Sequence, residues 1–286
     1  MSQNPYSKSP LNYIGGKYKI LPQITKFFPK NIHVLVDLFA GGCDVCSNIK
    51  ADKRYANDIN CYVIQIYKTF QSLTVEQLLT YIDQTITENH LSMTNKEAYL
   101  SFRKRYNESN DRNPLDLYIL VCYAFNYQFR FNNSHEFNSP FGKDRSSFNP
   151  AIRENLIQFH KNIQNIIFSS VDYKKFDITN LKKGDFLYAD PPYLITTGSY
   201  NDGKRGFHGW KKEDDQDLFK LLDRLNDQGV KFALSNVTEH KGIKNQELIQ
   251  WKKKYHTHRI QYNYKNSSYH GKNTDKKTCE VLITNY

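Results

Sequence analysis

Three short apolar runs constrain the fold of this chain more than any other feature. They span residues 34–39, 186–189 and 230–237, and each is apolar almost throughout instead of alternating with polar residues. Such runs are typical of strands that are buried on both faces of a parallel sheet. The first run ends at Gly41-Gly42, after which a helix and a second strand ending near Asp58 are expected. The sequence therefore predicts an α/β domain.

The middle of the chain has a different period. Between about residues 74 and 160 the apolar residues recur at helical spacing. The stretch 125–150 interrupts this pattern with aromatic, Asn-rich and basic residues, and it is typical of a hairpin or loop on a helical module. After residue 166 the α/β alternation returns, and segments 259–264 and 279–284 alternate like strands. We expect a discontinuous domain, residues 1–60 and 155–286, with an insertion at 61–154.

The charge balance points to a polyanionic partner. Forty Lys and Arg residues stand against 29 Asp and Glu, a net charge of +11. No apolar run is long enough to cross a membrane or to act as a secretion signal. The five cysteines are few and odd in number, which argues against a disulfide framework. These features predict a soluble cytoplasmic protein that has no membrane partner and no obligate protein partner.

The tetrapeptide Asp190-Pro191-Pro192-Tyr193 follows a predicted strand, where open α/β sheets bind their ligands. Two prolines fix the backbone, so the Asp190 carboxylate and the Pro191 carbonyl can present two rigid acceptors to an exocyclic amine. The Tyr193 ring offers a stacking surface for a planar heterocycle. The alternative is an ordinary surface turn, since Asp and Pro are turn formers.

A second motif, Phe39-Ala40-Gly41-Gly42, allows close backbone approach to a small ligand. Asp58 follows Gly41 by 17 residues, at the expected end of the next strand, where a carboxylate can accept hydrogen bonds from ribose hydroxyls. The spacing favours a nucleoside-bearing cofactor, but not a dinucleotide, because Cys43 and Cys46 stand where that motif needs glycines. A purely structural glycine turn is the alternative.

The N-terminal segment contains Tyr13-Ile14-Gly15-Gly16-Lys17. It lacks the earlier glycine and the following Ser or Thr of a phosphate loop. Lys17 could pair with a carboxylate, such as that of an amino-acid-like ligand, or it could be a solvated lysine. The Cys and His spacings do not favour a metal site.

These motifs, taken in order, resemble the Dam-type DNA adenine N6-methyltransferases, and the T-even phage Dam enzymes most closely. The resemblance runs nearly end to end and includes VDLFAGG, ANDI, SPFGK, IIFSSV, DFLYADPPYLIT and KFALSNV. It implies a Rossmann-like S-adenosylmethionine-dependent methyltransferase sheet with an inserted helical target-recognition domain. The implied reaction moves a methyl group from S-adenosyl-L-methionine to N6 of an adenine flipped out of double-stranded DNA, within GATC, and leaves S-adenosyl-L-homocysteine.

The resemblance also assigns roles to residues. The catalytic positions are Asp190, Pro191 and Tyr193. The implied cofactor pocket consists of Tyr13, Lys17, Phe39, Gly41, Asp58, Asp172, Tyr173 and Asp190, with Asp172 and Tyr173 on the adenine side. The implied DNA contacts are Phe125, Asn126, Arg130, Pro140 and Lys143, and no metal is implied.

Within the insertion, Phe125 and Asn126 match residues that fill the gap left by the flipped base, and Arg130 matches a guanine-reading arginine. A guanidinium suits guanine because its two donors meet O6 and N7. The alternatives are that Phe125 belongs to the core of the preceding helix and that Arg130 contacts phosphate. The chain departs from the family at Asn12, where the cellular enzymes have a lysine that reads the outer guanine, and at Gln128, where an apolar residue is usual.

Two other functions remain open. The same fold could act on N4 of cytosine or on RNA, because the pocket around Asp190 accepts any flipped amino heterocycle. The chain could also be an inactive DNA-binding regulator, although the presence of Asp190 and Lys17 argues against this.

Overall fold

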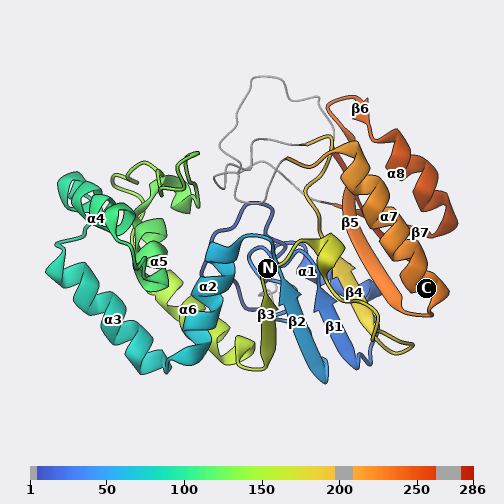
Figure 1. Cartoon of the computed structure of the whole chain (residues 1–286), viewed down its shortest axis with the longest axis horizontal. Helices are drawn as coiled ribbons and strands as arrows, with labels where there is room; N and C mark the ends of the chain where they lie inside the picture. The colour runs from blue at the N-terminus through green and yellow to red at the C-terminus, as the bar shows by residue number, and fades with distance from the viewer. Residues whose placement is uncertain (1–4, 197–208, 262–277) are drawn as a thin grey trace.

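The computed structural model describes residues 5–196, 209–261 and 278–286. Its centre is a sheet in the order β3-β2-β1-β4-β5-β8-β7, with β6 paired to β5 (Figure 1). The strands are β1 (Val34–Asp37), β2 (Lys53–Asn57), β3 (Ile166–Ser169), β4 (Phe186–Ala189), β5 (Lys231–His240), β6 (Ile243–Lys244), β7 (His256–Ile260) and β8 (Thr278–Thr284). The first five in spatial order run parallel, and β8 is antiparallel to both its neighbours. This arrangement confirms the expected α/β class, with a mostly parallel central sheet.

The two faces of the sheet are buried under different helices. Leu35 and Phe186 belong to a cluster with α1 (Leu21–Ile24), η1 (Thr25–Phe27) and α2 (Cys61–Ser72). Their chain neighbours Val36 and Leu187 belong to a second cluster with α7 (Lys212–Asp227) and α8 (Gln246–Trp251), after which η4 spans Lys252–Lys254. Successive residues of a strand point to opposite faces of the sheet. Because both faces are buried here, β1 and β4 are apolar almost throughout.

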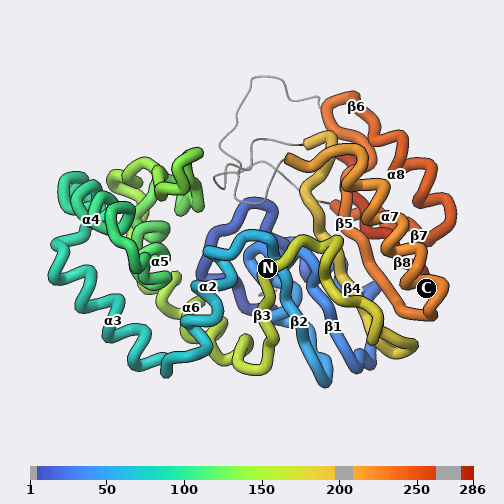
Figure 2. The backbone as a smooth tube through the Cα atoms, viewed as in Figure 1, coloured from blue at the N-terminus to red at the C-terminus, as the bar shows by residue number. Residues whose placement is uncertain are grey.

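The helical part lies to one side of the sheet (Figures 1 and 2). It contains α3 (Val75–Glu88), α4 (Lys96–Glu108), α5 (Pro114–Tyr123) and, returning to the sheet, α6 (Pro150–Ile163). Each begins at a side-chain cap, Thr74, Asn95, Asn113 and Asn149, which satisfies backbone N–H groups of the first turn. The helices share one apolar cluster with the sheet. The proposed division at residues 61–154 remains a prediction, and α6 crosses its second boundary.

Segment 124–149 folds back on itself beyond α5. After η2 (Phe125–Tyr127), isolated antiparallel bridges join Ala124 to Phe141 and Phe131 to Phe137. At its base, a side chain on Gly142 would collide with Ser146 and would come within 2.8 Å of the Ala124 carbonyl oxygen. The hairpin predicted from the sequence is therefore present, and it closes around a glycine.

Three sequence-based expectations need correction or qualification. The helix expected between Gly42 and the second strand is absent: residues 44–48 form turns, and Cys43 before them adopts a left-handed backbone (φ 58°) that interrupts helical geometry. The third apolar run, residues 230–237, forms β5, which continues beyond residue 237 to His240. The strand expected at 259–264 ends at Ile260, and residues 262–264 lie outside the described residues.

No helix among the described residues has the length and apolar character needed to span a membrane.

Candidate active site

The carboxyl ends of four parallel strands meet at one edge of the sheet. Phe39 follows β1, Asp58 follows β2, Asp172 follows β3 and Asp190 follows β4. In the register of the sheet, Asp37 at the end of β1 pairs with Tyr188 in β4, two residues before Asp190. The strand order reverses between β1 and β4, with β2 and β3 on one side and β5 on the other, and open α/β sheets form ligand crevices at such a point.

A cavity of about 350 Å³ opens at this edge, within the usual size range of small-molecule sites. Every residue that the sequence analysis assigned to the cofactor or to catalysis lines it: Tyr13, Lys17, Phe39, Gly41, Asp58, Asp172, Tyr173, Asp190, Pro191 and Tyr193. The structure thus brings together residues that are up to 180 positions apart in the chain. Their individual roles stay predictions.

Asp190 is held by two groups. The Lys17 ammonium lies 2.6 Å from Asp190 Oδ2, and the Tyr193 hydroxyl donates to Asp190 Oδ1 at 2.8 Å. Burial raises the pKa of the Asp190 carboxyl above its ordinary value, and the Lys17 ammonium opposes that rise. The motif is therefore an inward-facing part of the cavity and not an exposed turn.

Lys17 is not the solvated lysine of the alternative interpretation. Its side chain is only 9% exposed, and besides pairing with Asp190 it donates to the Gly15 carbonyl at 2.9 Å. The buried carboxylate of Asp44 holds the surrounding loop, because it accepts from the backbone N–H groups of Ser9 (3.3 Å) and Tyr18 (3.2 Å). Asp44 is a positioning residue that the sequence analysis missed.

Gly41 makes room for an aromatic ring. Its backbone is left-handed (φ 47°), and an added side chain would lie 3.0 Å from the Tyr13 ring. The motif predicted that this glycine allows a ligand to approach the backbone. In the structure, the space is occupied by Tyr13, which itself lines the cavity. The glycine is thus required for the local packing of the pocket wall.

Asp58 is fixed from both sides. Its Oδ2 accepts from the Gly41 N–H and its Oδ1 from the Asn60 N–H, each at 2.8 Å. Burial raises the pKa of Asp58, whereas these two backbone hydrogen bonds lower it. A carboxylate has about four lone-pair positions, so Asp58 retains capacity for further donors such as ribose hydroxyls.

Asp37 carries an unsatisfied acceptor at the cavity. Its Oδ2 accepts from the Cys46 N–H at 3.1 Å, but its buried Oδ1 has no hydrogen-bond partner in the part of the chain that the structure describes. Burial raises the pKa of Asp37 to about 8, the Cys46 hydrogen bond opposes this, and the nearby carboxylates of Asp190 and Asp58 add to the rise. A buried carboxyl of this kind suits a cationic or hydrogen-bond-donating ligand.

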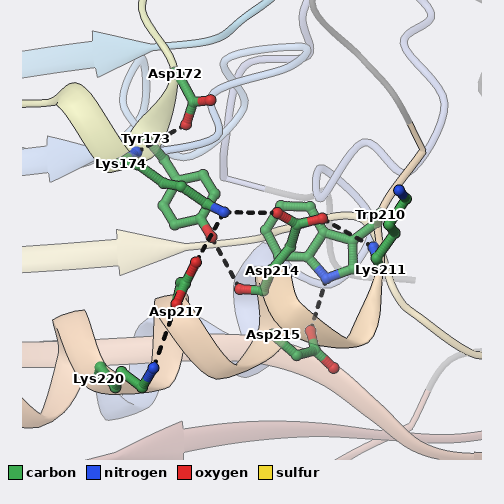
Figure 3. A network of polar contacts seen from close by, with 9 residues as sticks. All are labelled: Asp172, Tyr173, Lys174, Trp210, Lys211, Asp214, Asp215, Asp217 and Lys220. Atoms are coloured by element: carbon green, nitrogen blue, oxygen red, sulfur yellow. Dashed lines mark hydrogen bonds and ion pairs between the residues drawn. The ribbon is translucent and has the colours of Figure 1, made fainter.

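Two aromatic residues that were not predicted from the sequence, Trp210 and Phe129, also line the cavity. Trp210 lies just before α7 and contacts Phe39, a predicted cofactor-pocket residue. It also contacts Tyr173, which is predicted to lie on the adenine side (Figure 3). Phe129 comes from the hairpin, and its ring centroid is 6.4 Å from that of Tyr13. A tryptophan in an otherwise polar stretch was the only sequence signal for the first, and the aromatic richness of the hairpin for the second.

The predicted DNA-contacting residues lie outside the cavity, on the hairpin. Phe125 is only half-buried, so it does not belong to the core of α5, and the Arg145 guanidinium lies 5.3 Å from its ring centroid. Asn126 has a left-handed backbone (φ 54°), and its carbonyl accepts from the Asn12 side chain at 3.2 Å. This last contact connects the N-terminal loop to the hairpin.

Arg130, Pro140 and Lys143 are all exposed. The Arg130 Nε donates to Asn138 Oδ1 at 3.0 Å, which orients the guanidinium from within the hairpin. The Pro140 carbonyl accepts from the Phe125 N–H at 2.7 Å, so these two predicted contact residues are directly linked.

No group of three or more His, Cys, Asp or Glu side chains arranged to hold a metal ion occurs among the described residues.

The chain is similar to known DNA methyltransferases. The family model described as D12 class N6 adenine-specific DNA methyltransferase matches residues 13–273. The Type II methyltransferase M.FokI of Planomicrobium okeanokoites is 48% identical over 285 residues, which are 99% of this chain and 43% of that protein. The modification methylase StsI of Streptococcus sanguinis is 50% identical over 289 residues, 100% of this chain and 44% of that protein. The chain thus spans less than half the length of these relatives.

The DNA adenine methylase of Escherichia coli (strain K12) is more distant. It is 28% identical over 229 residues, which are 79% of each protein. The expected similarity to Dam enzymes therefore holds at the level of the wider family. The relatives that are about half identical are Type II methylases, and not the T-even phage Dam enzymes named in the sequence analysis.

Proposed function

Because the chain belongs to the D12 class of N6 adenine-specific DNA methyltransferases, we propose that it methylates N6 of adenine in double-stranded DNA. The proposed methyl donor is S-adenosyl-L-methionine, and S-adenosyl-L-homocysteine is the second product. One observation supports this above all others: Asp190, the predicted target-base residue, shares a single cavity with Phe39 and Asp58, the predicted nucleoside-binding residues. A methyl group can pass directly between two ligands only if they meet in this way.

The residues of the cavity fit this cofactor. Phe39 and Tyr173 offer aromatic rings, and Asp172 a carboxylate, to an adenine base. Asp58 offers acceptors to ribose hydroxyls. The buried oxygen of Asp37 that has no hydrogen-bond partner among the described residues could pair with a polar group at the methionine end. S-adenosylmethionine, when bound, supplies an electrophilic methyl group.

The chemistry left to the protein is positioning and electrostatics. The Asp190 carboxylate would accept a hydrogen bond from the N6 amine, which draws the nitrogen lone pair out of conjugation with the ring and directs it toward the methyl group. Lys17 and the Tyr193 hydroxyl fix the orientation of that carboxylate. The Pro191 carbonyl would accept the second N–H, and the Tyr193 ring would stack on the base. No covalent enzyme intermediate is required.

Base flipping would be assisted by the hairpin. Unstacking an adenine costs a few kcal/mol, which contacts in the pocket and a side chain inserted into the gap must offset. Phe125 and Asn126 are candidates for that insertion because they lie at the start of the hairpin and outside the core. The net charge of +11 favours the DNA backbone as the general partner.

The DNA sequence that the protein recognises is a more specific part of the proposal. We propose that Arg130 reads a guanine and that the site is GATC. Asn12 weakens the analogy at the outer guanine, because here it is used in a hydrogen bond to Asn126. We propose that Pro140 and Lys143 provide further contacts from the same hairpin.

Expression in a host without DNA methylation, followed by sequencing that detects modified bases, tests the function. N6-methyladenine confined to one motif supports the proposal, and GATC as that motif supports its finer part. N4-methylcytosine would favour the second enzymatic interpretation. DNA that stays unmodified while the purified protein binds it would favour an inactive regulator.

A further inference from the structure

Three aromatic rings form a compact cluster on the predicted adenine side of the cavity. The ring centroids of Phe39 and Tyr173 are 5.2 Å apart, those of Phe39 and Trp210 5.6 Å, and those of Tyr173 and Trp210 5.4 Å. All three residues line the cavity. Trp210 therefore lines the same part of the cavity as Phe39 and Tyr173, which the resemblance assigned to the cofactor pocket.

Two buried hydrogen bonds fix the Trp210 indole, and Figure 3 shows the first of them, to Asp215. The indole Nε1 donates to Asp215 Oδ1 at 2.7 Å, and the Asn245 side chain donates to Asp215 Oδ2 at 2.9 Å. Asp215 and Asn245 are both buried. A buried carboxylate costs free energy unless it is hydrogen-bonded, so this chain fixes the orientation of the indole with respect to the cavity.

A second set of contacts joins the start of α7 to the strand-end residues of the cavity. The Tyr173 hydroxyl donates to the Asp214 carbonyl at 2.9 Å. The Lys174 ammonium lies 2.9 Å from carboxylate oxygens of both Asp214 and Asp217. Figure 3 shows that the side chains of Tyr173 and Lys174 point toward α7. The Trp210 ring is thus held between η3 (Tyr173–Lys175) and α7.

We propose that Trp210 is a binding residue for the adenine ring of the cofactor and that Asp215 is the positioning residue for its indole. This inference rests on the proposed function, because it assumes an S-adenosyl ligand. The three centroids are at ordinary contact distance for aromatic pairs, which leaves no slot for a fourth ring between any two of them. A bound adenine ring therefore either contacts the outer surface of the cluster or displaces one of the three rings. Either event changes the surroundings of the Trp210 indole.

The chain contains a matched control for Trp210. Its only other tryptophan, Trp251, is equally buried but stacks on Phe219 at 4.5 Å and does not line the cavity. Trp251 therefore represents a tryptophan with a purely structural role. In the Trp251→Phe variant all tryptophan emission comes from residue 210.

The first test is fluorescence of the Trp251→Phe protein, excited where tyrosine does not absorb. We expect saturable emission changes with S-adenosylhomocysteine and with adenosine, and none with methionine. In the Trp210→Phe protein, emission from Trp251 should not respond to any of the three. A response of Trp210 to methionine but not to adenosine would overturn the proposal.

The second test is calorimetry with S-adenosylhomocysteine. Trp210→Ala should weaken its binding by about tenfold or more, the scale of losing one ring that stacks on a base. Trp210→Phe should recover much of the loss, whereas Asp215→Asn should shift the emission of Trp210 and weaken binding less. Unchanged affinity in Trp210→Ala would overturn this inference alone. Failure of the unmodified protein to bind S-adenosylhomocysteine would overturn it together with the proposed function.

Discussion

Replacing Lys17 with methionine should destabilise the protein and change how its stability depends on pH. Methionine keeps an unbranched apolar stem but removes the ammonium that lies 2.6 Å from Asp190 Oδ2. Asp190 then retains the hydrogen bond from the Tyr193 hydroxyl but loses its nearest positive charge. The variant thus isolates the contribution of one ion pair at the centre of the site.

The expected magnitude follows from burial. Removing one partner of a buried ion pair costs about 3–5 kcal/mol of unfolding free energy. The Lys17 and Asp190 side chains are 9% and 16% exposed, so some water remains near the pair and we expect about 3 kcal/mol, the lower end of the range. In the double variant Lys17→Met with Asp190→Asn no charge is left unpaired, and most of that loss should be recovered.

The sign of the pH effect follows from the pKa of Asp190. Burial already raises this pKa, and loss of the Lys17 ammonium should raise it further. A carboxyl whose folded-state pKa is raised makes its full contribution to folded-state stability below its unfolded pKa of about 4, and this contribution is lost progressively as the pH rises through the folded-state value. The penalty of Lys17→Met should therefore grow from acidic toward neutral pH.

Urea denaturation of the unmodified protein, both single variants and the double variant, at several pH values, measures these quantities. Comparison with the unmodified protein at each pH corrects for other titrating groups, such as Asp37. A penalty that does not vary with pH, or a double variant no more stable than Lys17→Met, would refute the reasoning.

The remaining predictions concern ligand binding. Asp58→Ala should weaken S-adenosylhomocysteine binding in calorimetry while the protein stays folded, and unchanged affinity would remove Asp58 from the cofactor site. Arg130→Ala should cost about 1–3 kcal/mol of binding free energy on the cognate DNA and relax discrimination at one base pair. Lys143→Ala, if Lys143 contacts only phosphate, should weaken all sequences alike and reduce the salt slope by about one unit. Measuring the affinity of both variants for single-base variants of GATC at two salt concentrations separates the two effects. An equal loss of affinity for every sequence with Arg130→Ala would show that this arginine contacts the DNA backbone.

Much of the fold could be predicted because its signals are local. The apolar run before Asp190 matches β4 from Phe186 to Ala189, and the run before Gly41 contains β1. Both runs reflect burial on two faces, a property that each strand carries in its own sequence. The prediction of a helix after Gly42 was wrong. Cys43 adopts a left-handed backbone that favours turns, and the hydrophobic pattern does not indicate backbone geometry.

The contacts within the site could not be predicted in the same way, since they join distant segments. Lys17 and Asp190 are 173 positions apart, and no pattern in either segment indicates that they pair. Trp210 was missed because it lies 17 residues beyond Tyr193 in a polar stretch. Only the tertiary fold, in which Trp210 joins the apolar cluster of β1 and α7, brings its ring beside Phe39.

The central claim is that Asp190 brings the target adenine to the methyl donor within one cavity. The most direct test measures transfer of a labelled methyl group from S-adenosylmethionine to double-stranded DNA, followed by digestion of that DNA to nucleosides. The unmodified protein should label N6-methyladenine alone, and Asp190→Ala should abolish transfer while DNA affinity stays largely intact, because phosphate contacts dominate binding. Label on cytosine, or transfer by Asp190→Ala at a rate near that of the unmodified protein, would contradict the claim.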